Sequence, residues 1–214
     1  MNTRRTFMRL AFGGVLGGGW LLSPILLAMR RAWAAGRKVL AKGTPRETLI
    51  HENPAALDTR NLEVTPLEEF GTMGLTDLVV DLAKWRLEVS GQVKRPLSLT
   101  YAQLTALPVI EREVLLICPG FFANHGRWKG LSIKGLLQQA DFDRAASRVM
   151  IGAEGDKSAS YPLADILSDK IFLAYQVNGR DLPRRHGFPL RVVAEDYYGS
   201  DWVKYVTRVS VERA

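Results

Sequence analysis

Cys118 is the only cysteine of the 214-residue chain, and it follows a short apolar run of strand length at residues 114–117. Pro119 forces the preceding residue into an extended conformation and ends the strand, and Gly120 lets the chain turn. We therefore expect the thiol where a buried strand opens into a loop that reaches Trp128. Functional groups often occupy such loops, and a thiolate can act as a nucleophile or a metal ligand. The alternative is that Cys118 is a small buried hydrophobic residue.

Basic residues gather in a second stretch, from the run HGFPLR at residues 186–191 to Lys204. The glycine and proline of that run are expected to shape a loop leading into a strand that presents Arg191. An arginine can bind a phosphate through two parallel hydrogen bonds, and a lysine supplies a compact positive charge. Because two more arginines precede the run, at positions 184 and 185, the stretch indicates a phosphorylated ligand. A solvated basic loop is the alternative.

Short strands must position these two stretches. Apolar residues, either alternating with polar ones or in short runs, predict strands at 85–89, 148–151, 171–177, 190–193 and 205–211. Asn178 and Gly179 predict a hairpin turn after the third of these strands.

Capping residues mark where helices begin. Thr100 and Gln103 form a capping box, Ser132 is expected to cap a helix that follows it, and residues 161–167 suit a third short helix. The fold class is therefore α+β, with a mixed sheet and short helices. A doubly wound nucleotide-binding fold is disfavoured, because no glycine fingerprint follows a strand and the βαβ spacing is irregular.

Charge and cysteine content exclude several classes of protein. The net charge of +7 falls to +2 when residues 1–34 are left out, since they hold five arginines and no acid. A dispersed +2 argues against a nucleic-acid-binding protein, which would carry clustered basic residues. One cysteine excludes an intramolecular disulfide, a CxxC-based zinc or iron–sulfur site and a CxxCH haem attachment.

Residues 1–34 have the features of an export signal. Arg4 and Arg5, followed by a hydrophobic position, resemble the twin-arginine motif, and residues 10–29 are uncharged. The tripeptide at 32–34 fits a small-x-small cleavage site. About 20 apolar residues can also span a bilayer, so a membrane anchor with basic flanks is the alternative. We expect a periplasmic protein that uses twin-arginine export and is either cleaved or anchored to the inner membrane.

Residues 35–62 are polar, charged and interrupted by prolines, which predicts a linker or an arm lying over the domain. His51 in this stretch has no motif around it and is interpreted as a surface histidine. The folded catalytic domain is expected at residues 63–214.

Taken together, these motifs resemble the molybdopterin-dependent oxidoreductases of the sulfite oxidase superfamily. The resemblance covers residues 63–214, and its most specific part is the run from Tyr175 to Lys204. The other matching residues belong to the first strand and helix and to the segment around the cysteine: Trp85, Gly91, Pro96, Leu99, Thr100, Leu116, Ile117, Cys118, Trp128, Lys129, Gly130, Leu131, Leu136 and Leu137. The resemblance implies the molybdopterin-binding fold of that family and a molybdenum–molybdopterin cofactor.

The resemblance also implies roles for individual residues. Cys118 would be the thiolate ligand of molybdenum. Molybdenum suits a soft ligand, and binding it would protect a lone thiol from oxidation. Arg191 and Lys204 fall on positions that bind the phosphate side of the pterin. His186 falls on a polar cofactor contact just before that arginine.

Three more positions take their roles from the resemblance alone. Asp156 and Ser158 would belong to another pterin-binding turn. Tyr198 is a candidate for the wall of the catalytic pocket.

Two departures from the family limit what the resemblance implies. Sulfite-oxidising members have a pattern similar to Cys-Ala-Gly-Asn-Arg-Arg at the metal segment, whereas residues 119–123 of this chain are Pro-Gly-Phe-Phe-Ala. Because this loop is apolar, a sulfoxide-like substrate is favoured over sulfite. The chain also ends just after the last predicted strand, so we expect a small monomer without an immunoglobulin-like domain. Its architecture would be similar to that of the periplasmic methionine sulfoxide reductase catalytic subunit.

The implied function is that of an exported oxidoreductase that transfers an oxygen atom or an electron pair at molybdenum. Electrons would pass to or from a separate protein, either a cytochrome or a haem membrane subunit, because the sequence holds no second redox motif. Two alternatives stay open: a non-catalytic, membrane-anchored binding module that keeps the fold, and a thiol hydrolase that pairs Cys118 with His125 or His186. For His125 and Arg127 themselves we expect exposed loop positions rather than places in the pocket.

Overall fold

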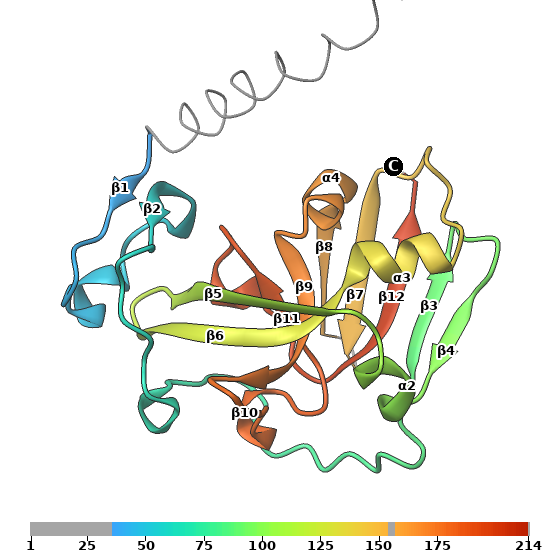
Figure 1. Ribbon diagram of the computed structural model, residues 1–214, viewed down its shortest axis with the longest axis horizontal. Coiled ribbons are helices and arrows are strands. Elements are labelled where there is room, and N and C mark those ends of the chain that lie inside the picture. The colour runs from blue at the N-terminus through green and yellow to red at the C-terminus, as the bar shows by residue number, and fades with distance from the viewer. Residues whose placement is uncertain (1–35, 154–156, 214) are drawn as a thin grey trace, which may run out of the picture. The chain divides into compact units, whose positions relative to one another are not determined.

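The computed structural model describes residues 36–153 and 157–213 (Figure 1). The predicted export signal and Asp156 therefore lie outside the described residues. The chain divides into two units, Met1–Arg37 and Lys38–Ala214, and the second unit contains all the helices and strands named below. No helix within the described residues is long and apolar enough to cross a membrane.

Two five-stranded sheets form the framework. The first contains β5 (Val109–Cys118), β6 (Phe122–Ser132), β9 (Ile171–Val177), β10 (Arg180–Asp181) and β11 (Arg191–Ala194). Its order is β10-β9-β6-β5, with β11 also paired to β9, and all neighbours are antiparallel. The second contains β3 (Leu87–Gly91), β4 (Leu97–Leu99), β7 (Arg148–Ala153), β8 (Ser158–Pro162) and β12 (Val206–Glu212). Its order is β4-β3-β12-β7-β8, and β12 runs parallel to β3, so the predicted mixed sheet is confirmed.

The helices are short, as predicted. Those within residues 36–153 and 157–213 are α2 (Tyr101–Thr105), α3 (Ile133–Gln139) and α4 (Leu163–Leu167). The capping box of Thr100 and Gln103 is confirmed, and the Ser132 hydroxyl accepts from the backbone N–H of Gly135 at 3.1 Å. The prediction of a helix over 161–167 is wrong at its start, because residues 161 and 162 belong to β8 and the helix begins only after Pro162.

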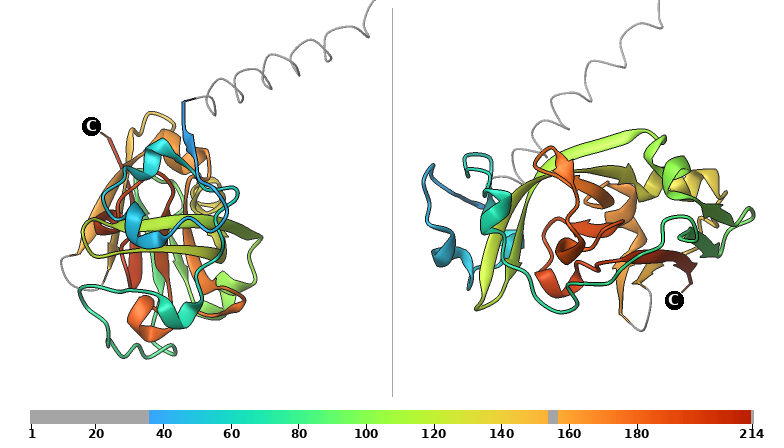
Figure 2. Two further views of the ribbon diagram at one scale, coloured as in Figure 1. Left: turned by 90° about the vertical axis from the view of Figure 1, so that its left-hand side faces the viewer. Right: turned by 90° about the horizontal axis from the view of Figure 1, so that it is seen from below.

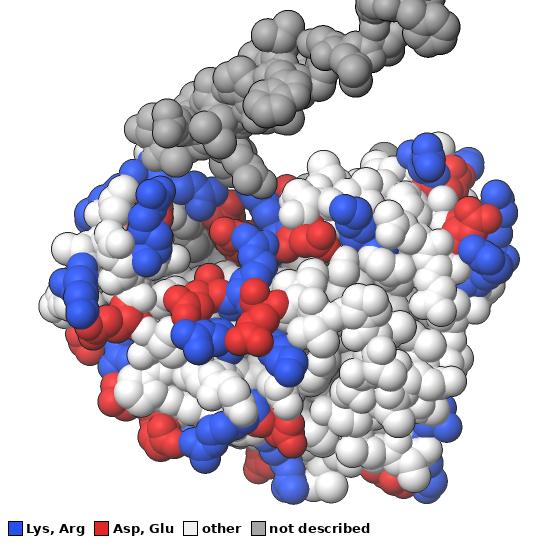
Figure 3. All heavy atoms as spheres, viewed as in Figure 1, with Lys and Arg blue, Asp and Glu red and all other residues white. Residues whose placement is uncertain are grey.

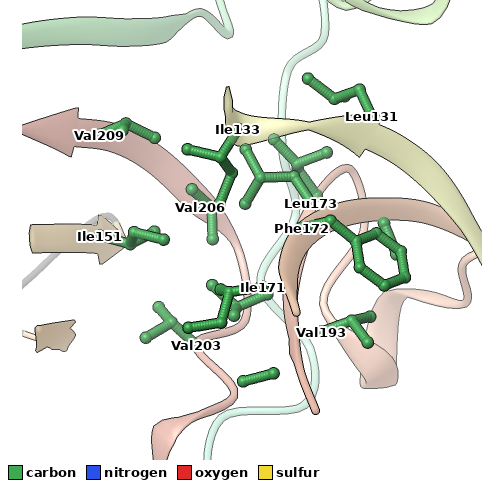
Figure 4. Close-up of a cluster of buried hydrophobic side chains, with 14 of the residues drawn as sticks. Leu131, Ile133, Ile151, Ile171, Phe172, Leu173, Val193, Val203, Val206 and Val209 are labelled. Atoms are coloured by element: carbon green, nitrogen blue, oxygen red, sulfur yellow. The ribbon is translucent and has the colours of Figure 1, made fainter. Parts of the chain in front are cut away.

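The main core lies between the two sheets (Figure 4). Every residue of β9 except Gln176 is buried. Ile171 and Leu173 of β9 point toward Ile133 of α3 and Val206 of β12. These contacts hold β9 in place, and β9 in turn fixes the position of its neighbours β6 and β11.

The hairpin of β5 and β6 differs from the prediction. A loop was expected from Pro119 to Trp128, but β6 begins at Phe122 and pairs with β5 along its whole length, from Cys118↔Phe122 to Val109↔Leu131. The polar residues of this stretch indicated a loop, because the hydrogen-bond partners that allow them to lie in a strand are distant in the sequence. Val114 and Leu116 pack into the main core, and Leu115 and Ile117 into a second cluster on the opposite face.

Residues 38–62 cover that opposite face. They form β1 (Lys38–Val39), η1 (Arg46–Leu49), η2 (Pro54–Ala56) and β2 (Leu57–Asp58). Figure 2 shows these segments beside the β5–β6 hairpin in both views. Their buried leucines pack on β5 and β6, at Leu40, Leu49, Leu57 and Leu62. Removing this segment would therefore expose the outer apolar face of the strand that carries Cys118.

Gly130 provides a test of the packing between β6 and β9. A Cβ at this position would lie 1.8 Å from the Leu173 carbonyl oxygen, so no side chain fits without a backbone shift. We expect Gly130→Ala to lower the free energy of unfolding by about 3 kcal/mol. Gly135→Ala is the matched control, because a Cβ there meets only Ser132 at 3.6 Å and alanine favours the helix. Urea unfolding of both variants measures the difference, and equal values would contradict the expected clash.

Candidate functional site

Cys118 ends β5, and the chain turns back through Pro119 and Gly120. The N–H of Phe121 donates to the Cys118 carbonyl at 3.0 Å, and Gly120 has φ +78°. Proline at the second turn position and glycine at the third are typical of a type II turn. The N–H of Gly120 also donates to the Ile50 carbonyl at 3.0 Å. The thiol therefore stands on a short turn that is tied to the N-terminal segment.

Gly199, which follows Tyr198, lies against the end of β5. A Cβ on Gly199 would be 3.3 Å from the Ile117 carbonyl oxygen and 3.7 Å from the Cys118 Cα, so the backbone passes close to the thiol. Tyr198 is 36% exposed, and Phe121 at the tip of the turn is 69% exposed. We call Cys118, Phe121, Tyr198 and Gly199 the thiol subsite. Cys118 is half-buried, and this burial raises the pKa of its thiol.

No base stands beside this thiol among the described residues. Side chains alternate along a strand, so His125, which pairs with Leu115, lies on the opposite face of the hairpin from Cys118. The ring of His186 hydrogen bonds with Arg185 instead. A thiol with a raised pKa and no adjacent base is a poor nucleophile, and the structure therefore gives the thiol hydrolase no support.

Arg191 is the most deeply buried charged group of the site. It is 5% exposed and lies at the start of β11. Its guanidinium carbon is 5.0 Å from the ring centre of Trp128 and 5.5 Å from that of Trp202, within the range of cation–π attraction. One guanidinium N–H donates to the His186 carbonyl at 3.1 Å. Burial lowers the pKa of Arg191 to about 10, which leaves it charged at neutral pH.

His186 ends the short helix η4 (Arg184–His186) and is 1% exposed. Its Nε2 accepts from Nε of Arg185 at 3.1 Å, so the ring is neutral in this arrangement. Burial, together with the positive charges of Arg191, Arg185 and Lys204, lowers the pKa of His186 to about 4. The histidine therefore adds a polar group to the site without adding another positive charge.

Lys204 completes this group of residues. Its ammonium donates to the Thr72 hydroxyl at 3.3 Å and to the Arg185 carbonyl at 3.2 Å. Burial, and then the charge of Arg191, lowers the pKa of Lys204 to about 8. A Cβ on Gly187 would be 2.8 Å from the Lys204 Cβ, so only glycine lets the two segments approach this closely.

We call Arg185, His186, Arg191 and Lys204 the cationic cluster. Among the described residues, no carboxylate forms an ion pair with any of its three cations. Some surface charges elsewhere do form ion pairs, as in Arg112–Glu195 at 2.6 Å and Arg127–Glu113 at 2.8 Å. Figure 3 shows both signs interspersed over the side that carries β5 and β6. Cations that share a partly buried site without a carboxylate are suited to bind an anionic group.

Trp128 connects the cationic cluster with the hairpin. Its indole N–H donates to the Val114 carbonyl at 3.1 Å. Val114 precedes Cys118 by four residues on β5, which corresponds to roughly 13 Å at about 3.3 Å per residue. A ligand that reached both would be extended, with an anionic end at the cationic cluster and a soft metal near the thiol.

The structure places Gly199, the residue after Tyr198, against the Cys118 backbone, and it brings His186, Arg191 and Lys204 together. It does not add Ser158 to either group. Ser158 is an exposed residue at the start of β8 in the second sheet, and no described hydrogen bond joins its side chain to the cationic cluster.

The prediction of an exposed loop position for His125 is wrong. The residue is 1% exposed, because β6 continues through it and residues 63–65 cover it. Its Nδ1 lies 3.3 Å from the Glu63 carbonyl oxygen, and burial lowers its pKa. Arg127 is exposed, but it also lies on β6 and pairs with Glu113.

Three contributors to the site were missed in the sequence. Thr72 precedes the first predicted strand in an irregular segment, Trp202 follows an ordinary turn, and Asn124 lies in the supposed loop. None carries a local signal, because each acquires its role from a partner more than ten residues away.

Comparisons with known proteins identify the family of this chain. The family described as oxidoreductase molybdopterin binding domain matches residues 74–214. An uncharacterized oxidoreductase of Bacillus subtilis, YuiH, is 33% identical over 119 residues, covering 55% of this chain and 60% of that protein. The putative protein-methionine-sulfoxide reductase subunit YedZ1 of Azospira oryzae is 30% identical over 132 residues, covering 62% and 50%. Mitochondrial sulfite oxidase of Homo sapiens is 31% identical over 192 residues, covering 75% and 35%.

A solved structure shares the fold. The sulfane dehydrogenase SoxCD of Paracoccus pantotrophus superposes with a TM-score of 0.61 at 21% identity, covering 64% of this chain and 40% of that one. This similarity supports the predicted fold class. The chain spans 60% or less of the length of each of these proteins.

The buried His186 predicts a pH dependence of stability. Its pKa is about 4 in the folded chain against an ordinary value of 6.5, so between these values the unfolded chain binds a proton that the folded chain does not. This contribution to stability is complete above pH 6.5 and is lost as the pH falls toward 4, by about 3 kcal/mol. We expect His186→Gln to flatten this part of the profile in urea unfolding of cofactor-free protein. Substitution of the exposed His51 by Gln is the control. If that variant flattened the pH profile equally, the pH dependence could not be assigned to His186.

Proposed function

This chain belongs to the sulfite oxidase superfamily of molybdopterin-dependent oxidoreductases, and from that premise we propose that it transfers an oxygen atom or an electron pair to or from a sulfoxide-like substrate. One observation carries the proposal. A lone thiol ends one strand of the β5–β6 hairpin, and Trp128 of the same hairpin contacts Arg191 of a partly buried cationic cluster that forms no ion pair with a carboxylate among the described residues.

The residues present fit the cofactor of the family. Arg191 and Lys204 offer donors and positive charge to the phosphate side of the pterin, and the pKa of each is lowered by burial. An anion bound between them would offset the unfavourable burial of these charges. Cys118 supplies one soft ligand at the other end of the site, and a soft thiolate suits molybdenum.

The cofactor, when bound, supplies the redox chemistry. The protein then has to place the substrate and exclude water. Hydrogen bonds hold the turn after Cys118, Gly199 lies close to the Cys118 backbone, and Phe121 in the same turn is exposed. The protein thus presents an apolar rim around the position that a metal on the thiol would take.

The apolar rim supports a sulfoxide-like substrate over sulfite. Residues 119–123 carry no charge that could attract an inorganic dianion. A sulfoxide is neutral, and the apolar groups on its sulfur can pack on an aromatic side chain. The relative YedZ1 is named as a putative subunit of a protein-methionine-sulfoxide reductase, which is the same substrate class.

Location and partners belong to the same proposal. The twin-arginine motif supports export to the periplasm, with the leader either cleaved or kept as an anchor in the inner membrane. A separate cytochrome or haem membrane subunit would exchange electrons with the site, because one thiol and one pterin provide no second redox centre.

Cys118→Ser tests the role of the thiol. Wild-type protein from a host with intact molybdenum-cofactor synthesis should contain close to one molybdenum and one pterin per chain. The variant should lose molybdenum or show an altered molybdenum spectrum, since a serine oxygen replaces the soft ligand. Ser168→Ala, outside both groups of site residues, is the control and should keep the wild-type content. Folded wild-type protein without molybdenum or pterin would contradict the proposal and favour a non-catalytic binding module.

Phe121→Ser tests the apolar rim. We expect KM for an aryl methyl sulfoxide to rise about tenfold with little change in kcat, because packing on the ring stabilises ground state and transition state alike. Dimethyl sulfoxide is the control substrate, since it is too small to cover the ring. Steady-state kinetics with a reduced dye as electron donor gives both constants. An equal change in KM for the two substrates would contradict a contact between the substrate and the Phe121 ring.

A further inference from the structure

Asn124 belongs to neither the thiol subsite nor the cationic cluster, although it is buried to 3% exposure on the Cys118 face of the hairpin. It pairs with Leu116, and directly opposite residues of an antiparallel pair point to the same face of the sheet. Leu116 and Cys118 are two residues apart on β5 and therefore share that face. The carboxamide of Asn124 is thus one strand away from the thiol strand, on the cofactor side.

Both halves of this carboxamide bind one residue of the chain. Its Oδ1 accepts from the N–H of Gly71 at 3.1 Å, and its Nδ2 donates to the Gly71 carbonyl at 2.9 Å. An amide side chain offers a donor and an acceptor on one planar group. Asn124 therefore acts on Gly71 as a neighbouring strand residue would.

Gly71 has to be glycine for this contact to form. A Cβ there would lie 2.3 Å from Cγ of Phe122 and 2.7 Å from its Cβ. Phe122 pairs directly with Cys118 across the hairpin. The segment at Gly71 is therefore pressed against the start of β6, close to the thiol.

The residue after Gly71 belongs to the other end of the site. The hydroxyl of Thr72 donates to the Arg185 carbonyl at 3.1 Å and lies 3.3 Å from the Lys204 ammonium. Lys204 also donates to the same Arg185 carbonyl at 3.2 Å. Thr72 thus provides one of the two oxygens that hold the ammonium of Lys204.

We propose that Asn124 is a positioning residue. By binding Gly71 it fixes the position of Thr72, and Thr72 in turn holds the Lys204 ammonium. The distance between Lys204 and Cys118 then allows one molybdopterin to contact both residues. This inference rests on the proposed function, since it assumes that the cofactor spans the two ends. Its basis is a continuous chain of contacts from β6 to Lys204, with each atom pair at hydrogen-bond distance. A preorganised site holds its ligand more tightly because less ordering remains at the moment of binding.

Asn178 offers a matched control. Its Nδ2 donates to the Thr65 carbonyl at 2.8 Å and its Oδ1 accepts from the N–H of Arg127 at 2.9 Å, so it also joins an irregular segment to β6 by two bonds. Neither partner contacts the cationic cluster through a described hydrogen bond. Asn178 has φ +52°, so alanine there adds backbone strain, and Asn178→Ala should destabilise at least as much as Asn124→Ala.

The experiment compares full-length wild type, Asn124→Ala, Asn178→Ala and Thr72→Val, each purified from a host with intact molybdenum-cofactor synthesis. Pterin and molybdenum per chain, the rate of pterin loss on dilution, and the thermal midpoint of cofactor-free protein are measured. We expect both asparagine variants to lower the midpoint, but only Asn124→Ala to release pterin faster, by about tenfold. Thr72→Val should release pterin faster with little change in the midpoint, since its hydroxyl bonds are partly exposed.

The outcomes separate this inference from the proposed function. If Asn124→Ala keeps pterin as well as Asn178→Ala does, while wild type holds the cofactor, the positioning role is overturned and the proposed function stands. If wild type itself contains neither pterin nor molybdenum, the proposed function fails and the inference fails with it. If Asn124→Ala yields no folded protein, Thr72→Val decides, and wild-type retention in that variant overturns the inference.

Discussion

Arg191 is buried against Trp128 and Trp202, and among the described residues its hydrogen bonds go only to backbone carbonyls. Burying a guanidinium without a carboxylate is unfavourable, and two aromatic faces offset only part of that penalty. The arrangement persists because β9 and β12 fix the backbone around it through a well-packed core. An anionic ligand would supply the missing partner, so this constraint explains why the cationic cluster exists at all.

The β5–β6 hairpin makes the link between that charge and the thiol. One face carries Val114, whose carbonyl holds Trp128, and four residues later Cys118. The other face packs against residues 38–62, which also bind the turn after Cys118 through Ile50. Because side chains alternate along a strand, one face of the hairpin can contribute residues to the site while the other face packs against residues 38–62. A substitution on the outer face can therefore shift the position of the Cys118 thiol, although the substituted residue does not contact the site.

The sequence predicted elements wherever a local rule is strong. The strand over residues 171–177 and the turn at Asn178 and Gly179 are confirmed, since β-branched apolar runs and an Asn-Gly pair each favour one conformation. The loop expected after Cys118 is wrong, because His125 and Asn124 look like loop residues until their partners Glu63 and Gly71 are known. A buried polar residue does not indicate a strand in the sequence when its hydrogen-bond partners are distant along the chain.

By itself, the sequence determined the fold class, the family and the residue types able to bind a soft metal and a phosphate, because these depend on composition, short motifs and spacing. It also placed Cys118 at a strand end, because proline and glycine act on the backbone locally. Only the tertiary structure decided that Arg191 lies against two tryptophans, that no described carboxylate forms an ion pair with the cationic cluster, and that Asn124 hydrogen bonds with Gly71. Those facts depend on which distant segments pack together, and packing is a property of the whole folded chain rather than of any stretch within it.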